Sequence, residues 1–265
     1  MIPEYFGSDT QKALQYRAWQ LWTLLRDDPR FYCHGRGVGL ADWNSGDIRE
    51  QKALARLQGI GAVEGVPDPE DHCARLETRG LRTDRFNRWQ SGPDVLDIAR
   101  SVRNARPLPP DLTVQATGSD TPADEMAGLD ALTQGCGVLL PMGAFLRGHD
   151  RPTVCLYASD GAGRIVGAAA SIAQFHPDHP KGGTAWWGML STDESRRGER
   201  IALILGAMAM LEMNARFGFA TFSTGIREGN APSEALCTKL GLRPTGDAVV
   251  IAIDPATFAA DRVTK

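Results

Sequence analysis

The segment from Leu190 to Ala202 contains residue types that suit the binding of a phosphate group. An apolar stretch ends here, a turn with Gly198 follows, and a long helical pattern begins near Glu199. The first N–H groups of a helix have no partner within it, and together with the helix dipole they attract anions. Three arginines add positive charge to the same turn: Arg196, Arg197 and Arg200. We therefore predict a pyrophosphate cradle here, with an ordinary solvated helix start as the alternative.

A second group of candidate residues surrounds the next helix. Asn230 precedes a predicted helix over residues 232–240. Cys237 in this helix could donate a proton as a thiol, since the ordinary pKa of cysteine is about 8.5. Ser233 is a second candidate acid, and the carboxylate of Glu228 is a candidate base. The structural alternatives are a small buried residue at Cys237 and a helix-capping hydroxyl at Ser233.

The elements that must position these residues follow a proline-rich stretch, Arg106 to Pro110. Apolar runs separated by turn signals, among them Asp160-Gly161, predict strands, and 3.6-residue periodicity predicts helices. The order is one strand, two helices, three strands, then helix, strand, helix and strand, which is typical of an α/β fold with a mixed sheet. The expected strands cover residues 112–116, 153–158, 164–175, 184–192, 220–226 and 249–253, and the expected helices 123–134, 142–146, 199–217 and 232–240.

The residues before this stretch favour helices. We expect helices within residues 10–25, 47–57, 69–78 and 95–102, and only residues 81–90, with four charged side chains, resemble a strand. Because three prolines in four positions interrupt regular structure, we place a domain boundary there. The prediction is a helix-rich N-terminal domain of unknown role, 1–106, and a second domain, 107–265. The first domain could also be a degenerate second copy of the other.

Both candidate segments resemble the GNAT superfamily of acyl-CoA-dependent N-acetyltransferases. The family's motif A reads Arg/Gln-x-x-Gly-x-Gly/Ala, and this chain has Arg197-Gly198-Glu199-Arg200-Ile201-Ala202, with Arg200 in place of the central glycine. The family also shows an Asn, a short helix with a tyrosine, and Leu-Gly-Phe. Here Asn230 and Lys239-Leu240-Gly241-Leu242 match in register, with Cys237 at the tyrosine position. The resemblance covers about the last 150 residues.

The resemblance implies a GNAT-like mixed central sheet flanked by helices, with acetyl-CoA or another acyl-CoA as co-substrate and no metal. Backbone groups of Leu190 and Thr192 would pair with the pantetheine amides, and Asn230 would lie near the pantetheine arm. Cys237 would protonate the departing thiolate after direct attack of an amine on the thioester. The pyrophosphate would be held by the backbone N–H groups of Arg197, Gly198, Glu199, Arg200, Ile201 and Ala202.

The identity of the general base stays open. The strand over residues 184–192 lacks the glutamate that the family often has there. The remaining candidates are carboxylates and imidazoles in nearby loops, and loss of the proton to water is equally compatible. These candidates are Asp193, Glu194, Glu228, His176 and His179.

The function implied is transfer of an acetyl group to a primary amine of a small molecule. One alternative is a catalytically degenerate domain that acts as an acyl-CoA-binding sensor or partner module, which the residues at Arg200 and Cys237 favour. Another is a protein N-acetyltransferase whose N-terminal part recruits a polypeptide. An open acidic groove would favour the protein substrate, and a closed pocket the small molecule.

Charge and composition argue against several other classes of function. A net charge of −3 gives no basic field for nucleic acid or anionic lipid, and the longest apolar run, residues 201–211, is too short to span a membrane. Five scattered cysteines without a C-x-x-C pair argue against disulfides and structural zinc. We expect a cytoplasmic protein, for which a homodimer is possible. A glycine-rich patch around His34 lacks the dinucleotide-binding pattern.

Overall fold

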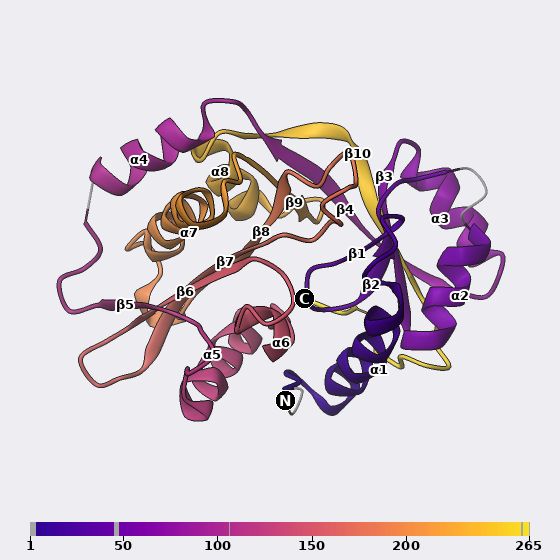
Figure 1. Ribbon diagram of the computed structural model, residues 1–265, viewed down its shortest axis with the longest axis horizontal. Helices are drawn as coiled ribbons and strands as arrows, with labels where there is room; N and C mark the ends of the chain where they lie inside the picture. The colour runs from indigo at the N-terminus through magenta and orange to yellow at the C-terminus, as the bar shows by residue number, and fades with distance from the viewer. Residues whose placement is uncertain (1–3, 45–47, 106, 261, 265) are drawn as a thin grey trace.

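The computed structural model describes residues 4–44, 48–105, 107–260 and 262–264. Its strands form one mixed sheet of ten in the order β1-β2-β3-β10-β4-β9-β8-β7-β6-β5, shown in Figure 1. The strands are β1 (Phe31–Cys33), β2 (Val38–Leu40), β3 (Ile60–Val66), β4 (Arg82–Ser91), β5 (Thr113–Ala116), β6 (Thr153–Ser159), β7 (Ile165–Ile172), β8 (Thr184–Thr192), β9 (Thr221–Ile226) and β10 (Leu242–Ile253).

Helices cover both faces of this sheet. They are α1 (Asp9–Leu25), α2 (Ile48–Gln58), α3 (Pro69–Glu77), α4 (Val95–Ala105), α5 (Ala123–Gly135), α6 (Gly143–Leu146), α7 (Ile201–Phe217) and α8 (Ala231–Lys239), with a 3-10 turn η1 (Glu194–Arg196). No helix among the described residues is long and apolar enough to cross a membrane. Within the same ranges, no group of three or more His, Cys, Asp or Glu is arranged to hold a metal ion.

The prediction of a separate helix-rich N-terminal domain is wrong. The four helices expected before residue 106 are present, but β1 to β4 join the same sheet as the later strands. Strands β1 and β2 have only three residues each, too few to show a period of two. The expected strand over residues 81–90 is confirmed as β4, although it lies in the middle of the sheet. Arg106, at the proposed domain boundary, lies outside the described residues.

The two halves of the chain repeat one topology. The series β1-β2-α2-β3-α3-β4 has the same order as β7-β8-α7-β9-α8-β10, and each contains a parallel pair joined by a helix, β2 with β3 and β8 with β9. The helices α3 and α8 are each followed by a glycine of positive φ, Gly80 at 78° and Gly241 at 79°, and then by a buried leucine. This repetition supports the interpretation of the first half as a second copy of the fold.

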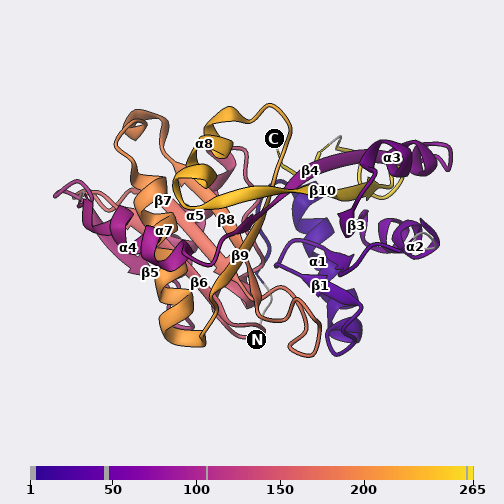
Figure 2. The same cartoon turned by 90° about the horizontal axis from the view of Figure 1, so that it is seen from above.

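The last strand of each half pairs with the other half. Strand β10 pairs with β3, and β4 pairs with β9, while β4 and β10 pair antiparallel with each other. Figures 1 and 2 show these two long strands side by side between the halves. The sheet is therefore continuous because the halves exchange strands.

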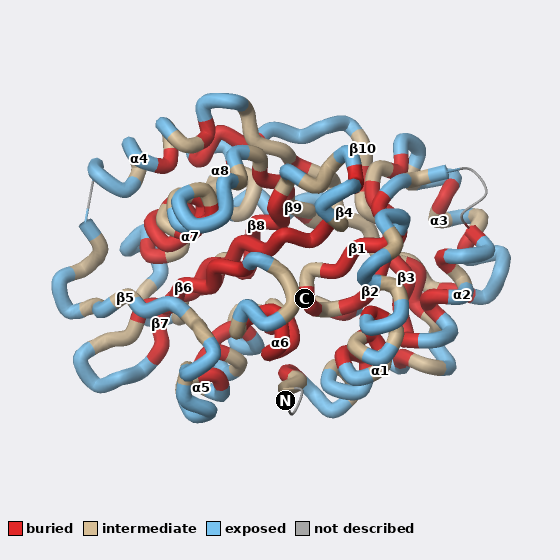
Figure 3. Tube along the Cα trace, in the orientation of Figure 1, coloured by how far each residue is buried: buried red, intermediate tan, exposed pale blue. Residues whose placement is uncertain are grey.

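The strongest burial in the second half follows β6, β7 and β8, as Figure 3 shows. Trp186 and Trp187 belong to different core clusters, as expected for neighbours in a strand. The Trp187 indole packs against Gly206 of α7 and donates to its carbonyl over 3.0 Å. A Cβ at Gly206 would lie 2.7 Å from the Trp187 ring, so this contact requires glycine.

Charged side chains meet where the halves join, and we call them the central polar cluster: Glu64, Asp42, Arg88, His179, Lys181 and Asp247. Arg88 of β4 is paired with Asp247 of β10 over 2.7 Å, and Lys181 with Asp42 over 2.6 Å. Glu64 of β3 is 6% exposed. Burial raises the pKa of Glu64 to about 7, although Lys181 and Arg88 oppose the rise. The Tyr32 hydroxyl is hydrogen-bonded to this carboxyl.

We expect Glu64→Gln to stabilise the protein at high pH and not at low pH. The Glu64 carboxyl has a pKa of about 7 when folded, against an ordinary value of 4.5. As the pH rises from 4.5 to about 7, the Glu64 carboxyl ionises in the unfolded chain before it ionises in the folded protein. The stability that the neutral carboxyl contributes is therefore lost progressively over this range. The loss is at most about 3 kcal/mol, and glutamine does not incur it.

The measurement is urea unfolding of wild type and Glu64→Gln at about pH 4 and about pH 8. The exposed Glu212→Gln on α7 is the control for loss of one carboxylate. A difference between wild type and Glu64→Gln that does not change with pH would contradict the assignment.

Candidate functional site

The parallel strands β8 and β9 separate after a short paired stretch. They pair only at Thr184–Trp186 with Thr221–Ser223. Beyond this point β9 pairs with β4 on its other side, from Ser223 to Ile226. The later part of β8 keeps only β7 as a partner, from Gly188 to Thr192. The backbone of β8 that faces the opening therefore has hydrogen-bonding capacity to offer a ligand.

A bulge in β8 lies at this opening. The register with β7 shifts between Gly188 and Ser191, and Met189 has a φ of 58°. A bulge bends its strand and redirects the backbone groups around it. Leu190 has no paired partner on β7, which leaves it suited to the predicted contact with an extended ligand. Thr192 pairs with Gly167, and its carbonyl also accepts from the Cys136 thiol over 3.4 Å.

Helix α7 begins beside the opening without a side-chain cap. Its N-cap residue, Arg200, has a φ of 64° and makes no capping hydrogen bond, and the φ of Gly198 is 88°. The first backbone bond of the helix runs from the Ile204 N–H to the Arg200 carbonyl over 3.0 Å. The N–H groups of residues 201–203 therefore have no acceptor within the helix, as the cradle prediction requires.

The three arginines of this turn differ in what they can offer. Arg196 contacts Glu199 over 2.8 Å and Asp111 over 2.9 Å, and Arg197 contacts Glu194 over 3.1 Å. Among the described residues, Arg200 forms no ion pair. The charge available to an anion at the turn therefore comes mainly from the backbone and Arg200. The contact with Asp111 joins the segment that follows the proline-rich stretch to the cradle.

Asn230 and Ser233 form the cap of α8. The Asn230 side chain accepts a hydrogen bond from the Ser233 N–H over 3.3 Å. Cys237 lies two turns further on, is 2% exposed and packs in the same core as α7. Burial raises the pKa of its thiol to about 12. The residue at the same distance before the glycine of α3 is the buried Leu76, so this position has a packing role in both halves.

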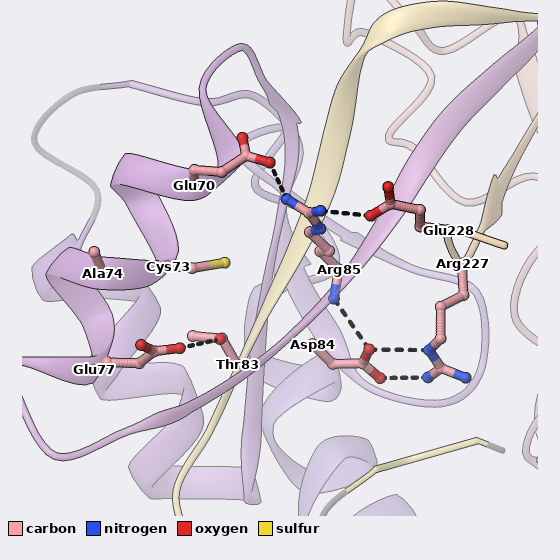
Figure 4. Close-up of a pocket in the computed structure, with 9 residues that line it drawn as sticks. All are labelled: Glu70, Cys73, Ala74, Glu77, Thr83, Asp84, Arg85, Arg227 and Glu228. Carbon is pink, nitrogen blue, oxygen red and sulfur yellow. Dashed lines mark hydrogen bonds and ion pairs between the residues drawn. The ribbon is translucent and has the colours of Figure 1, made fainter.

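Glu228 lines a groove that is separate from the opening between β8 and β9 and lies on the β4 side of β9. The groove has a volume of about 480 Å³ and lies between α3, the start of β4 and the end of β9. Glu228 contacts Arg85 over 2.6 Å, and Arg227 contacts Asp84 over 2.5 Å, as Figure 4 shows. Four carboxylates and two guanidinium groups line it. This is an open, acidic groove.

The other predicted bases are held by structural partners. The ring of His179 contacts Asp42 over 2.8 Å within the central polar cluster, and His176 lies 3.8 Å from Asp178. Asp193 accepts from the Ser195 N–H at the start of η1 over 3.0 Å. Glu194 pairs with Arg197. Each of these candidate bases therefore has a structural partner of its own.

Sequence reasoning missed one pair of side chains beside this opening. The Arg36 guanidinium lies over the Trp186 ring, 4.9 Å from its centroid, and His34 stacks on the same ring at 4.9 Å. Both come from the loop between β1 and β2. Gly35 in this loop has a φ of 84°, and a Cβ there would lie 2.8 Å from Pro141. The glycine-rich patch was the only signal for this arrangement.

Comparison with solved structures identifies the fold. A GCN5-related N-acetyltransferase from Kribbella flavida aligns with a TM-score of 0.52 at 16% identity, covering 92% of this chain and 95% of that one. An acetyltransferase-like protein of the same kind from Streptococcus suis aligns at 0.51 and 15% identity, covering 84% and 81%. A tandem GNAT protein from the clavulanic acid biosynthesis pathway aligns at 0.50 and 17%, covering 81% and 74%.

No family model matches the chain, and no curated protein matches it. The identities of 15–17% show the fold alone. The expectation that the resemblance covers only the last 150 residues is too narrow, because the aligned share includes both halves. The chain has the fold of the GCN5-related N-acetyltransferases, from its first strands to its last.

Proposed function

We propose that this protein transfers an acetyl group from acetyl-CoA to a primary amine of a small molecule. The observation that carries the proposal is the opening between β8 and β9 beside the uncapped start of α7. An extended pantetheine arm fits along a strand that has lost its neighbour, and a pyrophosphate fits the free N–H groups of a helix. The two features lie next to each other along the chain.

In this proposal the residues of the turn bind the cofactor through their backbone. Residues 197–202 hold the pyrophosphate, Leu190 and Thr192 pair with the pantetheine amides, and Asn230 lies beside the arm. Arg200 replaces a glycine of the family pattern, yet it adopts the left-handed backbone itself with a φ of 64°. This conformation costs an ordinary residue about 1 kcal/mol, so the turn keeps its shape and gains a cation.

The amine attacks the thioester directly, so no covalent intermediate on the protein is required. Holding amine and thioester together supplies most of what such a reaction needs. Cys237 is proposed as the proton donor to the departing thiolate. A thiol with a pKa of about 12 keeps its proton at neutral pH, but giving that proton to a thiolate whose ordinary pKa is about 8.5 is uphill, so packing is the competing role of this residue. The weaker candidates are Ser233 as acid, whose backbone N–H donates to Asn230, and Glu228 as base, whose carboxylate is paired with Arg85.

A second candidate function is acetylation of a lysine in a protein. The open acidic groove beside β9 favours it, since its four carboxylates outnumber its two guanidinium groups and the excess of negative charge would attract a basic polypeptide segment. The sensor interpretation is the third candidate. A screen for release of free thiol from acetyl-CoA over small amines and a basic peptide separates the three. Release with small amines supports the first function, release with the peptide alone the second, and binding without release the third.

Gly198→Asp should weaken acetyl-CoA binding by at least about 10-fold, because a carboxylate in the cradle repels phosphate. Calorimetric titration with acetyl-CoA and with CoA measures the loss. Gly163→Asp is the matched control, because Gly163 also has a positive φ, 80°, and also has open space around its Cβ position. Equal affinity of the two variants would place the cofactor elsewhere.

Cys237→Ala should lower turnover by about 10-fold or more if the thiol is the proton donor, with CoA affinity unchanged. Cys237→Ser keeps a group that can donate a proton and should retain more activity. Cys155→Ala is the control, because its thiol is equally buried and its pKa is also about 12. Equal turnover of wild type and Cys237→Ala would leave the residue with packing alone.

A further inference from the structure

A buried guanidinium beside the opening lacks a counter-charge. Arg36 donates from Nε to the Leu139 carbonyl over 2.6 Å and lies over the Trp186 ring. Its Nη2 is buried without a hydrogen-bond partner, and within the described chain no carboxylate lies within 4.0 Å of it. Burial lowers the pKa of Arg36 to about 10, so it is still a cation at neutral pH. An unpaired buried charge is costly.

We call the Trp186 ring, with His34 and Arg36 on it, the platform. A second buried polar atom without a hydrogen-bond partner belongs to it. His34 stacks on Trp186 and, at 6.1 Å, on Tyr32. Its Nδ1 is buried and has no partner among the described residues. Burial and the neighbouring Arg36 lower the pKa of His34 to about 3, so the ring is neutral and offers a hydrogen bond without charge. Both residues are of intermediate exposure, but the Arg36 Nη2 and His34 Nδ1 atoms themselves are covered, so binding of a ligand requires the atoms that cover them to move.

The platform lies where an acceptor would approach. Trp186 is the last residue of β8 that pairs with β9, and it lies on the face of the sheet away from α7. In the proposed function the pyrophosphate is bound at the start of α7. The thioester in the opening is then approached from the other face, beside Trp186.

We propose that Arg36 and His34 bind the carboxylate of the acceptor, so that the acceptor is an amino acid or another small amine that carries a carboxylate. This inference rests on the proposed function for the identity of the ligand as an acceptor. A guanidinium pairs well with a carboxylate in two parallel hydrogen bonds. One cation next to a neutral imidazole matches the single charge of a carboxylate better than a phosphate, which has a charge of about −2 at pH 7.

The anion could also belong to acyl-CoA, and the experiment separates the two sources. With CoA present in excess, calorimetry measures the affinity for each of the standard amino acids and for its carboxamide, which keeps the amine and loses the charge. We expect at least one amino acid to bind about 10-fold more tightly than its amide. Arg36→Met should reduce this preference to about 2-fold or less, while the affinity for CoA stays unchanged.

The matched control is Arg151→Met. Arg151 also lies over a tryptophan, Trp22, at 5.3 Å, and its Nε is also buried without a partner. Its side chain contacts Trp22 and the Arg26 carbonyl, neither of which belongs to β8 or β9. This variant should keep the full preference for the carboxylate. Circular dichroism checks that each variant folds, and Arg36→Gln, which also removes the charge but keeps a polar side chain, replaces Arg36→Met if the latter does not fold.

The proposal is overturned if no amino acid is preferred over its amide in wild type, or if the preference survives in the Arg36 variant. A fall in CoA affinity in Arg36→Met would also overturn it, because the anion would then belong to the cofactor. The thiol-release assay keeps the two proposals apart. A preference for the carboxylate that depends on Arg36, without release of free thiol, supports the carboxylate site and contradicts the transferase function. Release of free thiol with amines whether or not they carry a carboxylate supports the transferase function and contradicts the carboxylate site.

Discussion

The pairing of β4 with β10 is the interaction on which the rest of the fold depends. Each is the last strand of its half. Strand β10 lies between β3 and β4, and β4 lies between β10 and β9. Neither half can complete its sheet without the other. Arg88 and Asp247 join these two strands on the face where Glu64 is buried, so charge pairing is concentrated where the exchange brings the halves together.

The same exchange shapes the candidate site. Strand β9 has β8 on one side and β4 on the other, and its pairing passes from the first to the second at Ser223. The later residues of β9 stay paired with β4 while β8 diverges from them, and the bulge at Met189 bends β8 further. The first half thus contributes to the opening although it lacks the turn motif. It also supplies the loop that carries Arg36 over Trp186.

How far the sequence predicts this structure depends on the range of the interactions involved. The elements of the second half were predictable because α7 and its neighbouring strands are long apolar segments, ended by residues such as Gly218 and Gly241 that stop helices locally. Strands β1 and β2 were missed because they are too short to show a pattern. The seven residues of β3 are buried along nearly their whole length, so they show no alternation of apolar and polar side chains. The four charged side chains of β4 do not reveal its central place in the sheet, because the partner of Arg88, Asp247, lies far along the chain.

The candidate site divides in the same way. The cradle was predictable because its N–H groups, Gly198 and Arg200 are neighbours in sequence. The pairing of Arg196 with Asp111 was not predictable, since Asp111 comes from a distant segment, whereas Glu199 and Glu194, the partners of Arg196 and Arg197, lie three residues away in the chain. The environment of Cys237 became clear only with the core around it, and the platform of His34, Arg36 and Trp186 joins residues from opposite halves.

The ends of the ten-stranded sheet bear on how copies of this protein behave at high concentration. A large sheet offers its outermost strands as templates for strands of other molecules, which is a common route to aggregation. Here the outermost strands are β1 and β5, of three and four residues. Such short edges give an incoming chain few backbone groups to pair with. The exchange in the middle of the sheet thus joins two halves into one wide sheet while its outermost strands stay short.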